Sequence, residues 1–147
     1  MGRRALALAV DLMPTIGTDC QVILDGAGYF VEPHSYTMKR LRIRRAVITK
    51  DAAERYVDSG PGRREWHMIL LCLNELTDAT GQRLSQTGLQ FRDQLVASYA
   101  KVATISFTDL DGAAYTVHFD DFEEQVRDPR TQLTSPSYHC AVLLVEA

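Results

Sequence analysis

Short segments in which apolar and polar residues alternate predict a protein built mainly of β-strands. Near the start, residues 22–24 and 29–31 are apolar and flank Asp-Gly-Ala-Gly at positions 25–28. Glycine accepts a positive φ without steric cost, so this segment predicts a hairpin turn between two short strands. Pro33 cannot donate a hydrogen bond to a ladder, so we expect it to end the second strand.

A third strand is predicted over residues 36–48, which contain a dense run of positive charge. Leu41 and Ile43 alternate with three arginines, which are Arg40, Arg42 and Arg44. A period of two is typical of a half-buried strand, so we expect the aliphatic pair to face the core and the arginines to face outward.

Polar segments follow the third strand and occur again near the C-terminus. Residues 51–56 are compatible with a helical turn, and the glycines and proline of residues 59–64 predict an exposed loop. Residues 120–136 are polar and contain two prolines, which predicts a long exposed loop. We expect both loops to contact other subunits, because loops on a rigid scaffold commonly carry binding residues.

The second half of the chain predicts one helix on a sheet. Residues 66–73 are apolar on both faces, as in a strand covered on both sides. A helix is expected near residues 80–99, with a cap among residues 77–80, because one apolar stripe recurs at helical spacing: Leu84, Phe91, Leu95 and Tyr99. Gly88 would weaken the helix interior, and we expect it to permit a close approach to the sheet. Trp66 and the helix stripe should share one core.

Two further strands form a hairpin over residues 105–119 around an Asp-Leu-Asp-Gly turn, and a last strand covers residues 138–145. The predicted fold is therefore mainly β (α+β) with one helix. At 147 residues and 46% hydrophobic content, the chain is expected to be one domain spanning residues 1–147.

Composition limits the function. The net charge of −3 gives no bulk attraction to nucleic acid, and no run approaches the roughly 20 apolar residues of a membrane helix. The N-terminal apolar stretch is too short for a signal peptide, so we expect a soluble, unprocessed chain. Three cysteines without C-x-x-C spacing argue against a disulfide framework or a structural zinc site.

Candidate chemistry is sparse. The acidic residues Asp109 and Asp111 resemble a fragment of a calcium loop, but they precede Gly112 as a tight turn requires, and the turn is the better interpretation. The histidines show no metal-ligand spacing; they are His34, His67, His118 and His139. We expect no catalytic, metal or cofactor site, and no enzyme.

The arginine-rich strand has three possible roles: contact with phosphates, contact with an acidic patch of another subunit, or a solvated outer face. Nucleic acid is the least favoured, because no stacking aromatic residue lies in the run and the chain is acidic overall. If the strand meets another subunit, the candidate contact residues are Arg40, Arg42, Arg44, Arg63, Arg64, Asp120, Asp121, Glu123 and Glu124.

A family resemblance follows from the order of elements. Gly-Pro-Gly-Arg-Arg-x-Trp leads into the apolar strand, and Ile-x-Phe-x-Asp-x-Asp-Gly-x-x-Tyr-x-Val-x-Phe forms the second hairpin. Over roughly residues 29–145 the chain resembles the small tail proteins of long-tailed bacteriophages, in particular the tube-type domain of tail-tube and distal-tail proteins. The resemblance implies an antiparallel β-sandwich flanked by one helix. It also implies a structural virion protein that assembles with itself, as a hexameric ring around a DNA channel, and with other tail proteins. Neither sequence-specific nucleic acid nor a membrane is an expected partner.

Two other functions stay open at this point. One is a stand-alone β-sandwich module that binds a small ligand or carbohydrate. The other is a metal-dependent enzyme that uses His118, His139 and nearby carboxylates.

Overall fold

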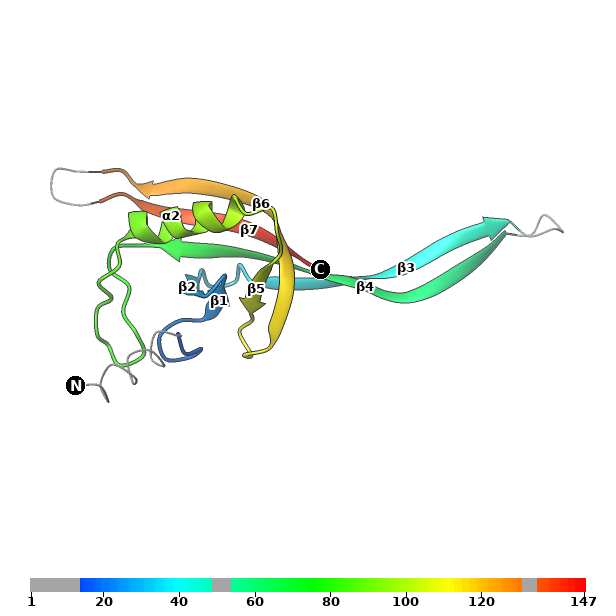
Figure 1. The fold of residues 1–147 in the computed structure, drawn as a ribbon, viewed down its shortest axis with the longest axis horizontal. Helices are drawn as coiled ribbons and strands as arrows, with labels where there is room; N and C mark the ends of the chain where they lie inside the picture. Colours follow the sequence, from blue (N-terminus) through cyan, green and yellow to red (C-terminus); the bar gives the residue numbers. More distant parts are fainter. Residues whose placement is uncertain (1–13, 49–53, 131–134) are drawn as a thin grey trace.

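The computed structural model describes residues 14–48, 54–130 and 135–147. Within these residues the fold is mostly antiparallel β with a single helix, which confirms the predicted fold class. Figure 1 shows the elements, which are β1 (Val22–Leu24), β2 (Ala27–Val31), β3 (Thr37–Ile48), β4 (Glu54–Cys72), α2 (Gly88–Tyr99), β5 (Ile105–Thr108), β6 (Ala114–Asp128) and β7 (Ser137–Glu146).

The strands form one continuous sheet that closes on itself, because its first strand, β2, also pairs with β4. Their order is β2-β1-β5-β6-β7-β4-β3, and β2 pairs in addition with β4. This closing contact places Phe30 opposite Leu71 and Val31 opposite Leu70. Every strand except β3 therefore belongs to a closed circuit, which we call the closed sheet. The predicted sandwich of two separate sheets is not confirmed, because the described strands all belong to one sheet.

The core fills the inner face of the closed sheet. Successive strand residues point to opposite faces, so each strand contributes every second side chain. Trp66 lies at the centre, with ring centroids of Phe107 and Tyr115 at 5.2 Å and 4.9 Å. Phe91 and Leu95 of the helix belong to the same buried cluster, which confirms the predicted common core.

The apolar run of β4 is covered less completely than predicted. Trp66, Met68, Leu70 and Cys72 are buried. The alternate residues are not: His67 is exposed, and Ile69 and Leu71 are half-buried. The prediction of a strand covered on both faces is therefore wrong: β4 packs its inner face on the core, as antiparallel strands commonly do. Its outer face keeps aliphatic side chains partly in solvent.

The helix begins later than predicted. Thr87 is its N-cap: its hydroxyl accepts a hydrogen bond from the Gln90 backbone N–H at 3.2 Å, and the Gln90 side chain accepts one from the Thr87 N–H at 2.9 Å. This capping box satisfies two backbone donors that a helix start leaves unpaired. The predicted cap at residues 77–80 is therefore wrong. Leu84 precedes the helix, although it still packs against the core.

Gly88 is the first residue of α2 and the point where the helix touches the sheet. A Cβ built on Gly88 would lie 2.4 Å from the backbone carbonyl oxygen of Cys72. The expected close approach is confirmed, and the Asn74 side chain secures it by accepting a hydrogen bond from the Gly88 N–H at 2.8 Å. From this start, α2 packs against β4, β6 and β7.

A long two-stranded ribbon projects from the closed sheet (Figure 1). β3 pairs with β4 from Thr37 opposite His67 to Ile48 opposite Glu54, whereas β7 accompanies β4 only from Glu65 onward. We call β3 together with residues 54–64 of β4 the arm. Lys39 and Arg40, at its root, pair with residues of β4 beside the closed sheet.

The arm corrects one loop prediction. Residues 59–64 do not form a loop but continue β4, with register shifts on either side of Arg42, which pairs with Pro61. Such irregularities let a strand accept proline and glycine, because the ladder is locally interrupted there. The helical turn expected at residues 51–56 is also wrong from Glu54 onward, where β4 begins; residues 51–53 lie outside the described part.

The second predicted loop is likewise largely strand. β6 continues to Asp128, paired with β7 from Val117 opposite Glu146 to Asp128 opposite Ser137. Residues 120–128 lack apolar alternation because most of their side chains are exposed, so the sequence pattern conceals a strand that the pairing with β7 stabilises. The predicted inward orientation of Leu41 and Ile43 lies outside the described side chains.

The helix packing generates a first prediction. Replacing Phe91 with alanine should lower the free energy of unfolding by about 3–5 kcal/mol, because a buried aromatic ring is lost and a cavity remains. Gln94→Ala, on the exposed side of the same helix, is the matched control and should change stability little. Chemical denaturation measures both; equal midpoints for the two variants would contradict the described core.

A second prediction concerns Gly88. Alanine is the better helix former by about 1 kcal/mol, yet Gly88→Ala should destabilise the protein by roughly 1–3 kcal/mol, because the new methyl group would overlap the Cys72 carbonyl. Thermal unfolding of the variant checks the sign. A variant more stable than the original protein would show that the helix does not approach the sheet so closely.

Candidate subunit interface

The arm is fixed to the closed sheet at its root by Arg64. The Arg64 backbone N–H and its guanidinium Nη1 donate to the two carboxylate oxygens of Glu146, at 3.2 Å and 2.9 Å. The guanidinium also lies 5.1 Å from the ring centroid of Tyr115, in a cation–π contact. We call these contacts the root clamp. They occupy Arg64 within its own chain, so we no longer count it among the candidate subunit contacts.

The root clamp shifts the titration of Glu146. The hydrogen bond from the Arg64 backbone N–H, aided by the charge of the guanidinium, lowers the pKa of the Glu146 carboxyl below its usual value. Hydrogen bonds and a positive charge both favour the ionised form. The clamp is therefore complete at neutral pH.

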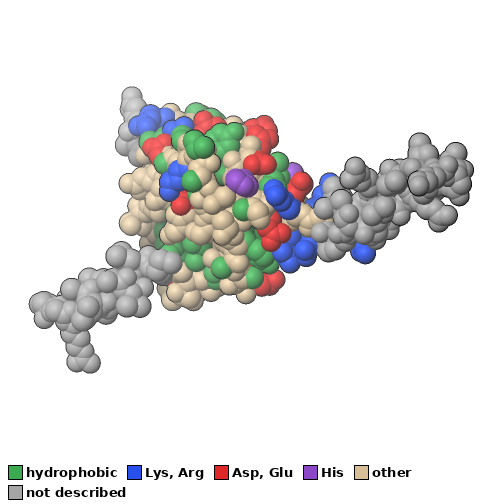
Figure 2. Space-filling model, turned by 45° about the vertical axis from the view of Figure 1, so that its right-hand side comes forward, with side chains coloured by type: hydrophobic (Ala, Val, Ile, Leu, Met, Phe, Trp, Pro, Cys, Tyr) green, Lys and Arg blue, Asp and Glu red, His purple; other side chains and the backbone are tan. Residues whose placement is uncertain are grey.

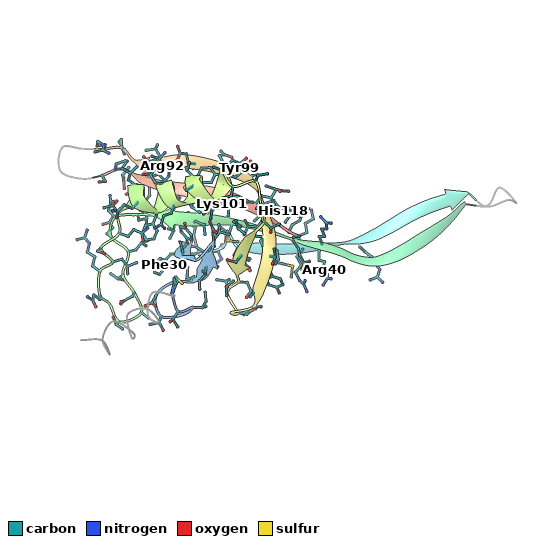
Figure 3. The ribbon with its side chains drawn as sticks, in the orientation of Figure 1. Phe30, Arg40, Arg92, Tyr99, Lys101 and His118 are labelled. Carbon is teal, nitrogen blue, oxygen red and sulfur yellow. The ribbon has the colours of Figure 1, made fainter. Side chains whose placement is uncertain are left out.

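Other arginines lie on the exposed surface near the root. Arg40 donates from Nε to the Gly62 carbonyl at 2.9 Å, and Figure 3 places it where the arm leaves the closed sheet. Arg42 and Arg63 are exposed, and the side chain of Arg44 lies outside the described part. Figure 2 shows basic side chains together with acidic ones at this junction. The structure thus places Arg40, Arg42 and Arg63 together at the root of the arm.

The four carboxylates of the predicted acidic cluster all lie on β6, but they do not all face the same side of the strand. Glu124 lies on the helix side, where the Arg92 Nη1 approaches its carboxylate at 3.3 Å. Asp120, Asp121 and Glu123 are exposed, and none of them has a Lys or Arg partner among the described residues. Three carboxylates of the cluster therefore remain available to a partner, and Glu124 does not.

The acidic residues at positions 109 and 111 belong to a tight turn, and the described histidines do not come together as metal ligands. The Asp109 carboxylate accepts hydrogen bonds from the N–H groups of Asp111 and Ala113, at 3.0 Å and 2.9 Å, which closes the turn as predicted. His118 is exposed, and His139 Nδ1 lies 3.4 Å from the Glu32 carboxylate. Among the described residues no three His, Cys, Asp or Glu side chains are arranged to hold a metal ion. The absence of catalysis stays a prediction.

The three cysteines, Cys20, Cys72 and Cys140, are free thiols and are buried. Cys72 and Cys140 approach each other to 3.6 Å between their sulfur atoms, and this hydrogen bond together with burial raises the pKa of the Cys72 thiol. Burial also raises the pKa of Cys20, to about 11. A protonated thiol is a poor nucleophile, so Cys20 and Cys72 serve packing.

Sequence reasoning missed Glu146 and Tyr115, which complete the root clamp. Glu146 is a charged residue near the C-terminus, and no local pattern links it to Arg64, 82 positions earlier. Only the pairing of β4 with β7 brings them together.

Within the described residues, α2 is too short to cross a membrane.

Comparison with known proteins adds no family. No family model matches this chain, and a search of curated proteins finds no matching sequence. The similarity to phage tail proteins therefore stays a prediction from the order of elements.

The root clamp generates a third prediction, on pH. Because the folded-state pKa of Glu146 is lowered, its contribution to stability is present above the unfolded pKa, 4.5, and is lost as the pH falls through the folded value. Glu146→Gln should therefore be less stable than the original protein by about 1 kcal/mol at pH 7, and the difference should disappear in acid.

Denaturant unfolding of both proteins across this pH range provides the measurement. Glu75→Gln, at an exposed position, is the control for loss of a negative charge and should show a smaller difference at pH 7. A stability difference that does not change with pH would assign the effect of Glu146→Gln to lost packing.

Proposed function

We propose that this protein is a structural subunit of a bacteriophage or phage-derived tail and that it assembles into a ring through its arm. The observation that carries the proposal is the arm itself: a ribbon with exposed arginines at its root, projecting from a closed sheet that presents exposed carboxylates on β6. The proposed function is therefore assembly, and the proposed location is the tail of the virion. The ring, expected to be a hexamer, and the other tail proteins as partners follow from the family resemblance.

The arm is built to reach another molecule. From Arg42 to Ile48 it extends about 20 Å at roughly 3.3 Å per residue. An isolated two-stranded ribbon is marginally stable in water, and its outer edges carry unpaired backbone groups. β3 has β4 as its only neighbour in the described sheet. A partner that covers the arm would therefore stabilise it.

The charges favour a head-to-tail contact. A symmetric contact between two arms would place the arginines of one β3 beside those of the other, and facing like charges are destabilising. A contact between the arm and the carboxylates Asp121 and Glu123 pairs opposite charges instead. Such a contact joins two different patches, and repeated around an axis it produces a closed ring.

A ligand-binding module has less support. The hollow lined by Cys20, Gly28 and Phe91 has a volume of about 200 Å³, below the roughly 300 Å³ at which ligand pockets begin. A larger hollow of about 470 Å³ lies along α2 and is lined only by Gln86, Gln90, Asp93 and Gln94. A third hollow, of about 340 Å³, has a mostly polar lining, which consists of Asn74, Glu75, Arg83, Asp128, Pro129, Ser135 and Ser137. None of these three hollows combines the size and the apolar lining that are typical of a small-molecule site.

The fourth prediction tests the head-to-tail contact. The original protein should self-associate at low salt, and the double variant Arg42→Glu with Arg63→Glu should not, because exposed charge pairs act as a group and weaken with ionic strength. Sedimentation velocity at low and high salt measures the assembly. Reversal of Arg127 and Arg130, exposed residues at the opposite hairpin, is the control with the same change in net charge.

Rescue makes the test specific. Mixing the arm variant with a second variant, Asp121→Arg with Glu123→Arg, should restore association, since each supplies the charge that the other has reversed. A protein that stays monomeric at every concentration and salt would favour the ligand-binding alternative. Association unaffected by the arm variant would return the arginines to a solvated face.

A further inference from the structure

We propose that a hollow in the outer face of the closed sheet binds an arginine side chain from the arm of a second copy. The hollow lies over Ala141 of β7, and we call it the Ala141 hollow. This inference rests on the proposed function and names the surface that receives the arm. It assigns a role to side chains that the fold itself does not require.

The hollow arises from side-chain size. Ala141 pairs with Ile69 of β4 on one side and with Glu123 of β6 on the other. Side chains at facing positions of neighbouring strands point to the same face, so a methyl group stands between two long side chains. The resulting hollow has a volume of about 180 Å³ and is lined by Ile69, Glu123, Gln125, His139 and Ala141.

Its lining matches an arginine side chain. Ile69 and Ala141 supply an apolar floor for the aliphatic stem, and the Glu123 carboxylate, which has no cation partner among the described residues, supplies a bidentate acceptor for the guanidinium. Gln125 offers a further amide oxygen. Arginine is suited to such a site because its donors form a planar fork and its head is weakly hydrated.

His139 completes the wall of the hollow. Its Nδ1 faces the Glu32 carboxylate at 3.4 Å, while its Nε2 is buried and has no hydrogen-bond partner within the described chain. In the neutral ring with the proton on Nδ1, Nε2 accepts a hydrogen bond. Because Nε2 is buried, an occupant of the hollow does not reach it, and the imidazole contributes its exposed edge to the wall.

The arm supplies the arginine. Arg40, Arg42 and Arg63 are exposed near its root, and Arg40 already donates to the Gly62 carbonyl within its own chain. The root clamp holds the base of the arm on its own closed sheet, and the rest of the arm projects away from that sheet (Figure 1). The hollow of a neighbouring copy is then the available acceptor.

The experiment compares two lining variants by sedimentation equilibrium at low salt. Glu123→Gln removes the acceptor charge and Ala141→Leu fills the hollow without changing charge; each should weaken self-association about fivefold to tenfold. The controls are Asp111→Asn in the β5–β6 turn and Ala97→Leu on the exposed side of α2, which make matched changes elsewhere. Both controls should associate like the original protein.

A double-mutant cycle then identifies the arginine. Arg40→Gln, Arg42→Gln and Arg63→Gln are each combined with Glu123→Gln; the arginine that enters the hollow should show a loss that is not additive with the loss of Glu123.

The outcomes separate the two proposals. If the original protein assembles and both lining variants assemble equally well, the Ala141 hollow is overturned and the ring subunit stands. If Glu123→Gln weakens assembly but Ala141→Leu does not, the attraction is general and the hollow is again rejected. If the original protein never associates, the proposed function falls, and the hollow falls with it.

Discussion

The short pairing between β2 and β4 is the contact on which the rest of the structure depends. By joining Phe30 and Val31 to Leu71 and Leu70, it converts an open sheet into a closed one with an interior. Buried apolar area is the main favourable contribution to folding, and closure of the sheet lets it surround Trp66, which is almost fully buried. The helix then adds Phe91 to this interior and lies against the sheet.

Closure also determines where the arm can begin. β4 has nineteen residues, and its edges change partners along its length: near Cys72 it lies between β2 and β7, and beyond Arg64 it has β3 alone. The N-terminal part of β4, residues 54–64, is thus one strand of the arm, and its C-terminal part, residues 65–72, belongs to the closed sheet. The root clamp between Arg64 and Glu146 lies at this transition.

The distribution of charge gives the protein a direction. Arg40, Arg42 and Arg63 lie at the root of the arm, and carboxylates such as Asp121 and Glu123 lie on β6, so the surfaces proposed to meet are different, as a head-to-tail contact requires. Charge attraction in water is weak for each pair and serves orientation more than affinity. The Ala141 hollow would add shape to that attraction, because a filled hollow removes apolar surface from water.

The sequence alone predicted the local elements: the two hairpins, the C-terminal strand, the turn at Asp109 and the core residues Trp66 and Phe91 all follow from alternation, turn chemistry and helical spacing. It failed at residues 59–64 and 120–128, where glycine, proline or charge hides strands whose hydrogen bonds come from distant partners. The sequence identified the arginines as candidate contact residues. It did not reveal that Arg64 forms an ion pair with Glu146, nor that a hollow lies over Ala141. Local patterns record conformational preference and burial, whereas ring closure, the arm and the interface depend on which strands pair, and only the tertiary structure decides that.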